Sequence, residues 1–432
     1  MKILLTGAHG FIGARLLDAL LADGHHLTCV VRTIHARDLS SARARYVPAD
    51  IARLGHAEDW MPLLAGVQIA INTVGIFREA GADRYAALHE DAAIALFTAA
   101  RQSGARVIHF SALGADADAQ SAFHRSKRAA DDALRALGPP GFIAQPSLVY
   151  GAGGASAALF NGLAALPLAP LPGGGWQRIQ PIHVDDVVAA VRAMLRYPVQ
   201  ATVTVPLCGP QVVTLRDYLA TLRQALGFVN RQRILPIPAP LADLVAAAGA
   251  RIPGALLHSD SLAMLNRGNT GDPAALSELI GRPPRPPTAF VPSHEREPLR
   301  AQAIMRNMLP ALRLSLALVW LWTAMVSLGL YPVRDSLDLL RQAGVPAILA
   351  PVALYGAAAL DLLLGALTLA SPHPGRRWVW LGQMILVLAY SVIITLRLPD
   401  QWLHPFGPMS KNLPILALLA LLYLWDSPRG KR

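Results

Sequence analysis

The hydrophobic pattern changes abruptly along this chain of 432 residues. In the first part short apolar runs alternate with polar segments, whereas the last part is almost continuously apolar. Three runs of the last part, Leu312–Leu330, Ala347–Ala370 and Trp378–Leu396, are long enough for transmembrane helices, which need about 20 apolar residues. A fourth run, Leu413–Trp425, is shorter and has Pro414 near its start, so a buried or interfacial helix is its alternative. The pattern predicts a soluble part followed by a bundle of about four transmembrane helices.

The first part shows the alternation of an α/β protein. Apolar runs that predict strands lie at Met1–Leu5, Leu27–Val31, Arg45–Val47, Ile69–Val74, Val107–Ser111 and Phe142–Gln145. Apolar residues at helical spacing separate several of these runs, as in Tyr85–Ser103 and His124–Leu137. This alternation is typical of a doubly wound parallel sheet of the Rossmann type. From about Leu215 to Leu279 the pattern is helical and rich in alanine, which we interpret as a small cap over the carboxyl ends of the strands.

A proline-rich segment separates the two parts. Arg282–Pro287 reads Arg-Pro-Pro-Arg-Pro-Pro, which cannot continue a helix and favours extended backbone. We therefore predict a Rossmann-type domain over residues 1–281, with its cap at about 215–281, a linker over 282–310 and a membrane domain over 311–432.

The net charge of +11 is explained by where the basic residues lie. Arginines precede the first apolar run and separate the second from the third, and further basic residues close the chain. By the positive-inside rule these segments face the cytoplasm. We expect a multi-pass protein of the cytoplasmic membrane, with the N-terminal domain and the C-terminus inside. No nucleic-acid-binding motif is visible. The two cysteines, Cys29 and Cys208, form no disulfide or metal pattern, and no metal is predicted. Residues 1–5 predict a strand and not a signal peptide.

A glycine-rich turn follows the first strand and opens a helix. It reads Thr6-Gly7-Ala8-His9-Gly10-Phe11-Ile12-Gly13. In this context Gly7 permits the tight turn, Gly10 lets the backbone approach a pyrophosphate, and Gly13 lets the helix pack closely on the strand. The N-terminus of the helix then directs unpaired N–H groups at the phosphates. The turn predicts a dinucleotide site.

The end of the second predicted strand bears on the cofactor. A carboxylate there binds the ribose 2′-hydroxyl of NAD, whereas an arginine accommodates the 2′-phosphate of NADP. The strand ends at Arg32, with Arg37 nearby and no acid at that point. This favours NADP(H) over NAD(H), and the alternative is that Arg32 is a solvated loop residue.

These motifs resemble the extended or atypical short-chain dehydrogenase/reductases, particularly the branch that includes the 39-kDa accessory subunit of respiratory complex I. The resemblance covers roughly the first 290 residues, and its further matches are Asp50, Asn72–Gly75, Ser111, Lys127, Pro146–Gly151 and Gln180–Val187. It implies cofactor contacts by Thr6, Gly7, His9, Gly10, Phe11, Ile12, Gly13, Asp50, Ile51, Thr73, Val74, Gly75, Lys127, Pro146, Ser147 and Val149. The apolar part resembles the DoxX-like family, on the motifs His404–Pro408 and Lys411–Pro414.

The resembled family transfers protons with a serine, a tyrosine and a lysine, and the tyrosine stands four residues before the lysine. Ser111 and Lys127 match, but Phe123 occupies the tyrosine position and cannot transfer a proton. Loss of a positioned acid or base typically lowers the rate about 10²–10⁴-fold. His124 is the candidate substitute, although it lies about a quarter turn further round the helix. Its alternative is a surface or cap contact. Lys127 keeps its ribose-binding role in either case.

One carboxylate lies within the second apolar run. Asp361 there costs roughly 2.5–3.5 kcal/mol on insertion scales, so we expect it to face the bundle interior and to have a partner. The candidate partners are Gln383, Lys411 and Asn412. The functional interpretation is a quinone, proton or small-ligand site, and the alternative is a hydrogen bond in helix packing.

The leading hypothesis is a membrane-anchored NADP(H)-binding oxidoreductase that acts on a hydrophobic membrane substrate, such as a quinone, an isoprenoid or a lipid. Phe123 supports a second hypothesis, a non-catalytic nucleotide-binding subunit that assembles or regulates a membrane complex. The third hypothesis is an epimerase or dehydratase of a nucleotide-linked or lipid-linked sugar.

Overall fold

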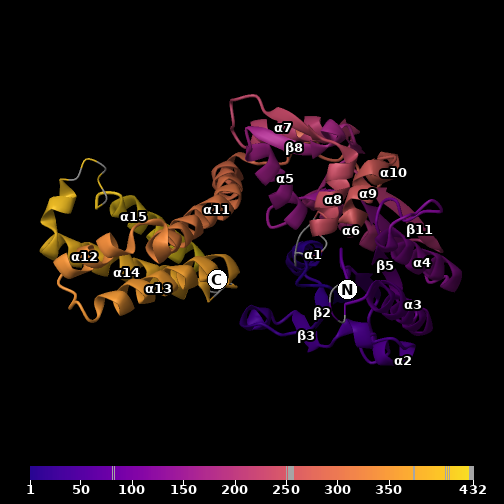
Figure 1. Ribbon diagram of the computed structural model, residues 1–432. Coiled ribbons are helices and arrows are strands. Elements are labelled where there is room, and N and C mark those ends of the chain that lie inside the picture. The colour runs from indigo at the N-terminus through magenta and orange to yellow at the C-terminus, as the bar shows by residue number, and fades with distance from the viewer. Residues whose placement is uncertain are drawn as a thin grey trace. The chain divides into compact units, whose positions relative to one another are not determined.

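The chain forms two compact units, Met1–Ala303 and Ile304–Arg432 (Figure 1). The computed structural model describes residues 1–79, 81, 83–249, 251, 257–372, 375–403, 405, 407 and 409–427, and the side chains of Arg37 and Leu39 lie outside the described part.

The first unit is built on one parallel sheet of seven strands. Their order across the sheet is β11-β6-β5-β4-β1-β2-β3. Their bounds are β1 Lys2–Thr6, β2 His26–Val31, β3 Ala44–Pro48, β4 Ile69–Asn72, β5 Arg106–Phe110, β6 Gly141–Pro146 and β11 Thr202–Leu207. All neighbouring pairs run parallel, so the carboxyl ends of the strands meet at one edge. The predicted Rossmann-type doubly wound sheet is confirmed.

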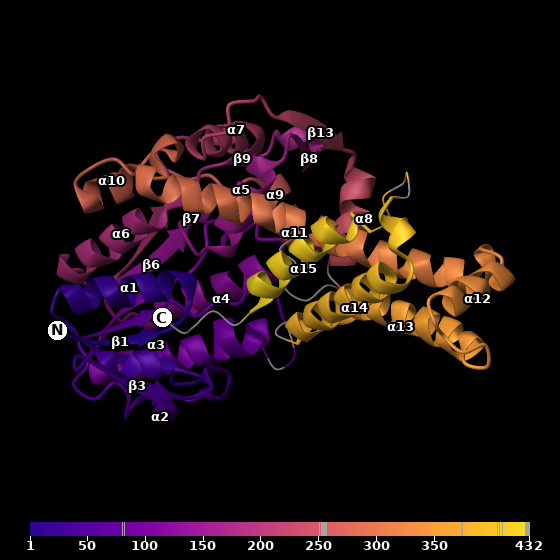
Figure 2. The same ribbon diagram turned by 90° about the vertical axis from the view of Figure 1, so that its left-hand side faces the viewer.

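Helices cover both faces of the sheet. Alternate strand residues explain this, because Ile3 and Leu5 of β1 join one apolar core and Leu4 joins the other. One core includes α1 Phe11–Ala22, α6 Val184–Arg196 and α10 Ala274–Ile280. The other includes α2 Ala57–Trp60, α3 Ala92–Ser103 and α4 Ala122–Leu137. Figure 2 shows α1 and α6 on one side of β1 and α3 on the other.

Two elements of this unit differ from the sequence-based expectation. The edge strand β11 was not predicted, because its sequence Thr-Val-Thr-Val-Pro-Leu has no continuous apolar run and holds a proline. An edge strand tolerates that proline, since one side needs no ladder partner. The helix expected from Tyr85 begins with a π-helical segment, Ala86–Asp91, before α3.

A second lobe of the first unit has its own core. It joins α5 Ala155–Ala165, β8 Leu168–Pro172 and α7 Leu215–Ala225, and the partly buried Ile234 of β13 Arg233–Ile237 packs against it. The lobe begins before the cap predicted at about 215–281, because α5 and β8 precede that range. At the other end, Leu276 of α10 is buried in the Rossmann core. Two further helices of the predicted cap range are α8 Ala239–Gly249 and α9 Ser259–Arg267.

The segment 282–310, expected to be a linker, is packed structure. Arg282 Nη2 and the Arg285 N–H donate to the buried carboxylate of Asp186, at 2.5 and 2.8 Å. Phe290 is buried and stacks on Tyr150 with ring centroids 5.1 Å apart. The prolines keep residues 282–286 out of a helix, but they do not exclude burial, and a short 3-10 helix follows at Pro287–Ala289. The next helix, α11, begins at Ser293 and ends at Met325, so it crosses the division between the units.

The second unit is helical. After α11 and a π-helical segment, Val326–Leu330, it holds α12 Val333–Gln342, α13 Ala350–Ala370, α14 Arg376–Arg397 and α15 Asn412–Asp426. Among the described residues, three helices are long and apolar enough to cross a bilayer: Ser293–Leu330, Ala350–Ala370 and Arg376–Arg397. The fourth expected helix, α15, has 15 residues, which makes it the short member of the set. The polar helix α12 was not predicted.

A buried ion pair holds the second unit together. Asp426, at the end of α15, accepts from Arg313 Nη2 of α11 at 3.0 Å and from Trp380 Nε1 of α14 at 2.9 Å. Arg376 Nη1 lies 3.9 Å from the same carboxylate. Three helices are therefore joined at one carboxylate.

Candidate dinucleotide site

The turn between β1 and α1 has the geometry that a pyrophosphate requires. Gly7 has φ +72°, which favours glycine, and its carbonyl accepts from the Gly10 N–H at 2.8 Å. A Cβ added to Gly13 would lie 2.0 Å from the Gly7 oxygen. No side chain caps the N-terminus of α1, so its first N–H groups are available to an anion. The residues present therefore fit the phosphates of a dinucleotide.

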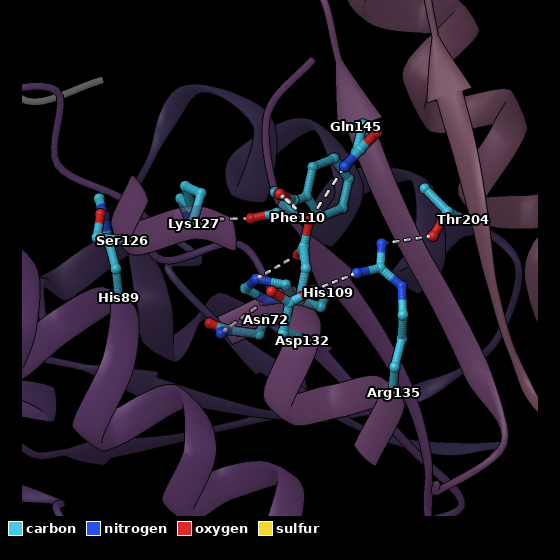
Figure 3. Close-up of polar contacts among 12 residues, drawn as sticks. Asn72, His89, His109, Phe110, Ser126, Lys127, Asp132, Arg135, Gln145 and Thr204 are labelled. Atoms are coloured by element: carbon cyan, nitrogen blue, oxygen red, sulfur yellow. Dashed lines mark hydrogen bonds and ion pairs between the residues drawn. The ribbon is translucent and has the colours of Figure 1, made fainter. Parts of the chain in front are cut away.

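Buried polar side chains join the turn to the centre of the sheet. Thr6 Oγ1 donates to Asn72 Oδ1 at 2.7 Å, and the Val74 N–H donates to the same oxygen at 3.2 Å. Asn72 Nδ2 lies 3.2 Å from His109 Nδ1 (Figure 3). An amide nitrogen only donates, so His109 Nδ1 accepts and Nε2 carries the proton, 3.7 Å from Asp131 Oδ1. Burial lowers the pKa of His109, consistent with a neutral ring.

Lys127 lies beside the strand ends that the resemblance assigns to the cofactor. Its Nζ donates to the carbonyl oxygen of Val74 at 3.1 Å. It also donates to the carbonyl oxygen of Phe110, at 2.9 Å (Figure 3). A Cβ added to Gly75 would lie 3.3 Å from this Nζ. Burial lowers the pKa of Lys127 to about 8. A lysine has three N–H donors, so one remains for a ribose hydroxyl.

Phe123 lies in an aromatic cluster next to Lys127. Its ring contacts Phe77 at 5.3 Å, His89 at 5.6 Å and Tyr85 at 6.2 Å between centroids. Tyr85, which sequence reasoning did not select, donates its hydroxyl to the Phe77 oxygen at 3.0 Å, and burial raises its pKa to about 12. A phenol thus stands beside the position where the family has its tyrosine, but it is bound to the main chain.

His89 was also missed, and its protonation can be assigned. Its Nε2 accepts from the Ile76 N–H at 3.0 Å, so Nδ1 carries the proton and donates to Ser126 Oγ at 2.9 Å. Burial, and secondly the charge of Lys127, lower the pKa of His89 to about 2. This neutral ring supports the loop before α3 and does not exchange protons at ordinary pH.

The two other predicted catalytic residues, Ser111 and His124, lie in different surroundings from each other. Ser111 Oγ donates to Asp131 Oδ2 at 2.7 Å, and Gln145 Nε2 donates to the same oxygen at 3.1 Å. Burial raises the pKa of Asp131 to about 6. His124 is buried, and its Nε2 would lie 3.2 Å from a Cβ at Gly114, so its ring lies against that loop. Asp131 follows Lys127 by one helical turn, a spacing that was visible in the sequence.

Two carboxylates lie beside Arg32, although the sequence has no acid at the end of its strand. Its guanidinium forms a bidentate pair with Asp83 and lies 3.7 Å from Asp50 Oδ1. Asp50 also accepts from the Ala52 N–H at 3.3 Å and so caps the short helix that starts at Ile51. The predicted partner Arg37 has its side chain outside the described part of the chain. Asp83 was missed because it lies 51 residues further along the chain.

The remaining predicted contacts lie at or next to the carboxyl ends of the strands. Thr73 Oγ1 donates to the Thr6 oxygen at 2.7 Å, and His9 Nε2 contacts Asp38 Oδ2 at 3.0 Å. Ser147 Oγ donates to the Gln180 oxygen at 2.6 Å. Pro146 ends β6, Val149 begins the short strand Val149–Tyr150, and the Phe11 ring lies where a Cβ on Gly154 would meet it.

Two comparisons of sequence decide the family. The description "NAD dependent epimerase/dehydratase family" matches residues 3–205. A protein named ceramide reductase, from Caulobacter vibrioides, is 30% identical over 243 residues, which are 55% of this chain and 74% of that protein. This chain belongs to the NAD dependent epimerase/dehydratase family. The family binds a nicotinamide dinucleotide, so NAD(P) is the cofactor.

Further proteins are similar to this chain in sequence or in fold. A mitochondrial protein of Arabidopsis thaliana, named subunit 9 of the NADH dehydrogenase [ubiquinone] 1 alpha subcomplex, is 26% identical over 255 residues, 56% of this chain and 61% of that protein. A nucleoside-diphosphate-sugar epimerase from Staphylococcus aureus has a TM-score of 0.54 at 18% identity, covering 67% of this chain and 99% of its own. A mutant UDP-glucuronic acid 4-epimerase from Bacillus cereus has a TM-score of 0.53 at 18% identity, covering 72% and 100%. At such identities the structures show the fold alone.

The second unit is similar to the DoxX-like family, as its sequence predicted. A DoxX-like family description matches residues 317–420. This epimerase/dehydratase family member is therefore a membrane protein with about three candidate spans. His404, Phe406 and Pro408 of the predicted DoxX-like motif lie outside the described residues.

The polar residues expected to pair within the bundle take other partners. Gln383 Nε2 donates to Thr368 Oγ1 at 2.7 Å, and Asn412 Nδ2 donates to Ser391 Oγ at 2.9 Å. Among the described residues, neither Asp361 Oδ1 nor Gln383 Oε1, both buried, has a hydrogen-bond partner. Lys411 donates its backbone N–H to Gly407 and stands just before α15. The amide nitrogens of Gln383 and Asn412, two of the partners suggested for Asp361, are thus engaged elsewhere. Within the described part of the chain, no group of three His, Cys, Asp or Glu side chains is placed to hold a metal.

Proposed function

We propose that this chain is a membrane-anchored NAD(P)H-dependent reductase whose substrate is a bilayer lipid of the ceramide type. The observation that carries the proposal is the presence, in one chain, of a dinucleotide site with its lysine and of helices long enough to cross a membrane. The similarity to a protein named ceramide reductase favours a lipid over the quinone and the isoprenoid.

The chemistry is hydride transfer to a ketone. When bound, the reduced nicotinamide supplies a hydride to the carbonyl carbon, and the carbonyl oxygen must receive a proton. The side chain of Phe123 has no exchangeable proton to donate. Lys127 has its pKa lowered to about 8 by burial, which matches the release of a proton near neutral pH. Since only one N–H of Lys127 remains after its bonds to Val74 and Phe110, we assign to Lys127 the ribose contact and the supply of the proton by relay through the ribose hydroxyl.

Ser111 and His124 have smaller roles in this proposal. The Ser111 hydroxyl is held by Asp131, so it positions the strand end beside Lys127 and polarises the substrate oxygen only after it leaves that carboxylate. His124 lies against Gly114 and is the alternative proton source. A His124→Ala variant that keeps full turnover assigns the proton to Lys127.

For the cofactor we propose NADP(H), on the strength of Arg32 at the end of β2. Its pairing with Asp83 and Asp50 stabilises the guanidinium but competes with a 2′-phosphate. Asp83→Asn is therefore expected to tighten NADPH binding relative to NADH, and Arg32→Ala to reverse the preference. A cytoplasmic nucleotide domain is proposed from the arginines that flank the apolar helices, including Arg306 and Arg376.

A second candidate function rests on Phe123. The family's proton-transferring residue is replaced there, and one relative is named as a subunit of an NADH dehydrogenase. The chain would then bind its nucleotide as a structural or sensing group in a membrane complex.

The test uses the full-length protein in lipid nanodiscs, with NADPH and the ketone form of a ceramide. We expect steady oxidation of NADPH that is lost in Lys127→Met and retained in Lys2→Met, the same change at an exposed lysine. Tight NADPH binding without oxidation, across keto-lipids and quinones, would favour the subunit function. Native mass spectrometry of the protein from its own membranes then shows whether other polypeptides stay attached.

A further inference from the structure

One helix of the first unit exposes apolar side chains where a soluble protein has polar ones. On α8, Leu244 is 66% exposed, and Leu241 and Val245 are each 47% exposed. The opposite side of the helix carries Ala242 and Ala246, which are buried against Leu262 of α9. Since the small residues face inward and the large ones outward, the pattern is the reverse of that of an amphipathic surface helix.

The neighbouring strands extend this surface. In the parallel pair of β8 and β13, Leu235 lies opposite Pro170 and Leu168 opposite Arg233, and both leucines are exposed. Trp176 is 63% exposed. A Cβ on Gly174 would lie 3.5 Å from its ring nitrogen and 3.7 Å from Pro236 of β13, so the indole stands beside the strand. Figures 1 and 2 both place β8 and α8 on the same side of the first unit.

Basic residues accompany the apolar ones. The Arg216 guanidinium lies over the Trp176 ring, 4.4 Å from its centroid. Arg231, just before β13, and Arg233, its first residue, are exposed. The three elements α8, β8 and β13 together hold one carboxylate, Asp243. Tryptophan with arginine above a layer of leucine and valine is the composition of a protein surface at the boundary between lipid and water.

We infer that Leu168, Trp176, Leu235, Leu241, Leu244 and Val245 form a docking face that lies against the surface of an anionic phospholipid bilayer. Two arguments select this occupant. The chain already carries membrane helices, so a bilayer is always present within reach of the first unit. The face is also apolar and basic, which complements anionic head groups and the acyl chains below them.

The position of α9 gives the docking face a role in the proposed function, on which this step of the inference rests. Leu262 of α9 packs against α8, whereas Met264 packs against the cluster of Tyr85 and Phe123. His258, at the N-terminus of α9, contacts Phe77, which contacts Phe123. A single helix thus separates the docking face from the residues beside Lys127. An extracted lipid would pass along α9 to present its carbonyl group to the nicotinamide.

The test places a nitroxide on the docking face of the full-length protein. Cys29 and Cys208 are buried, so Leu244→Cys offers one exposed thiol for labelling. Val203→Cys is the control, because Val203 is an exposed apolar residue, at 42%, on the edge strand β11. Collisions with oxygen, which concentrates in lipid, are compared with collisions with a water-soluble nickel complex.

In nanodiscs that contain phosphatidylglycerol, we expect the label at position 244 to meet oxygen and to be shielded from nickel, with the reverse at position 203. In amphipol, without a bilayer, the label at position 244 should become open to nickel. Free access of nickel in nanodiscs would overturn the inference. Equal shielding in both media would also overturn it, because protein and not lipid would then cover the face.

Turnover gives an independent measurement. Leu244→Glu with Val245→Glu is expected to raise the KM for the bilayer-borne ketone about 10-fold and to leave the NADPH affinity unchanged, since only access to the lipid is impaired. Val203→Glu should change neither. If no substrate is turned over, the labelling still decides the docking face. If turnover persists without shielding, only the docking inference fails.

Discussion

The buried carboxylates of the two units differ in how many hydrogen-bond donors they have. In the first unit, Asn72 is bonded to His109, and one oxygen of Asp131 accepts from Ser111 and Gln145. His109 Nε2 and Asp131 Oδ1 approach to 3.7 Å, and neither atom has a hydrogen-bond partner among the described residues. In the second unit, Asp426 is equally well supplied with donors, but Asp361 Oδ1 has no hydrogen-bond partner among the described residues. An unpaired polar atom costs more in lipid than in a soluble core, because no water compensates it. Asp131 keeps one oxygen bonded by two donors, whereas no hydrogen bond to Asp361 is present among the described residues, so we single out Asp361 as the carboxylate that awaits a partner.

The helix register shows what lies around Asp361. Gln383 is bonded to Thr368, and α13 and α14 are consecutive helices joined by a short connection. Two helical turns back from Thr368 is Asp361, and two turns on from Gln383 is Tyr390. In an antiparallel pair these two residues lie at the same level. The carboxylate, the phenol and the free oxygen of Gln383 therefore follow one seam between two helices, which we propose as the ligand or proton site of the bundle, with Lys411 near its end.

The largest loss of stability is expected when the carboxylate of Asp426, which accepts from Arg313 and Trp380, is removed. Asp426→Ala leaves the half-buried Arg313 without its partner; the loss of one partner of a fully buried pair costs about 3–5 kcal/mol, which is the upper limit here. We expect the second unit of this variant to unfold at much lower temperature in detergent, measured by loss of helical circular dichroism. Asp338→Ala, which removes an exposed partner of Arg341, is the control and should change little. An equal loss in both variants would contradict the role of Asp426 in joining the three helices.

The network of the first unit predicts a pH dependence through Asp131. Burial raises its pKa from 3.8 to about 6 in the folded protein, so the folded state binds the proton more tightly than the unfolded state. The resulting stabilisation is complete below the unfolded pKa and is lost as the pH rises through about 6, and it amounts to about 3 kcal/mol at most. Asp131→Asn should remove this dependence.

Thermal unfolding of the two proteins between about pH 4 and pH 7 measures it. The variant is expected to gain stability relative to the parent as the pH rises. A constant difference across the range would mean that Asp131 stays ionised throughout.

A smaller pH effect is expected on NADPH binding, through loss of the positive charge of Lys127. Burial lowers the pKa of Lys127 to about 8, so the ammonium is lost within an accessible range. Above that pH we expect NADPH to bind up to about 10-fold more weakly for each further pH unit, because the ribose loses its charged donor. Fluorescence titration of NADPH against pH shows this. Lys127→Met should bind more weakly at all pH values and show no such slope, and a slope that survives in the variant belongs to another group.

The sequence predicted what depends on local pattern. The glycine turn, six of the seven strands of the sheet (β1 to β6) and the apolar helices follow from short-range periodicity and turn chemistry. It did not reveal Asp83 or His89, because each meets its partner only through the tertiary fold. The packing of Phe290 was hidden for a different reason, since prolines identify extended backbone but say nothing about burial. The missing tyrosine at Phe123 was readable, whereas the neighbouring Tyr85 was not.

The smallest stability effect, and the most informative one, is expected at Asp361. Asp361→Asn preserves the shape of the side chain and removes only the charge and the exchangeable proton, so a residue without a partner should change bundle stability by less than about 1 kcal/mol. Thr368→Val is the contrast, because it removes a hydroxyl that Gln383 uses and so strands a buried donor. If Asp361 serves a ligand or a proton, turnover in nanodiscs falls in the asparagine variant while its unfolding temperature does not. If stability and turnover are both unchanged, the seam has no function, and the two units differ only in how completely their polar atoms are paired.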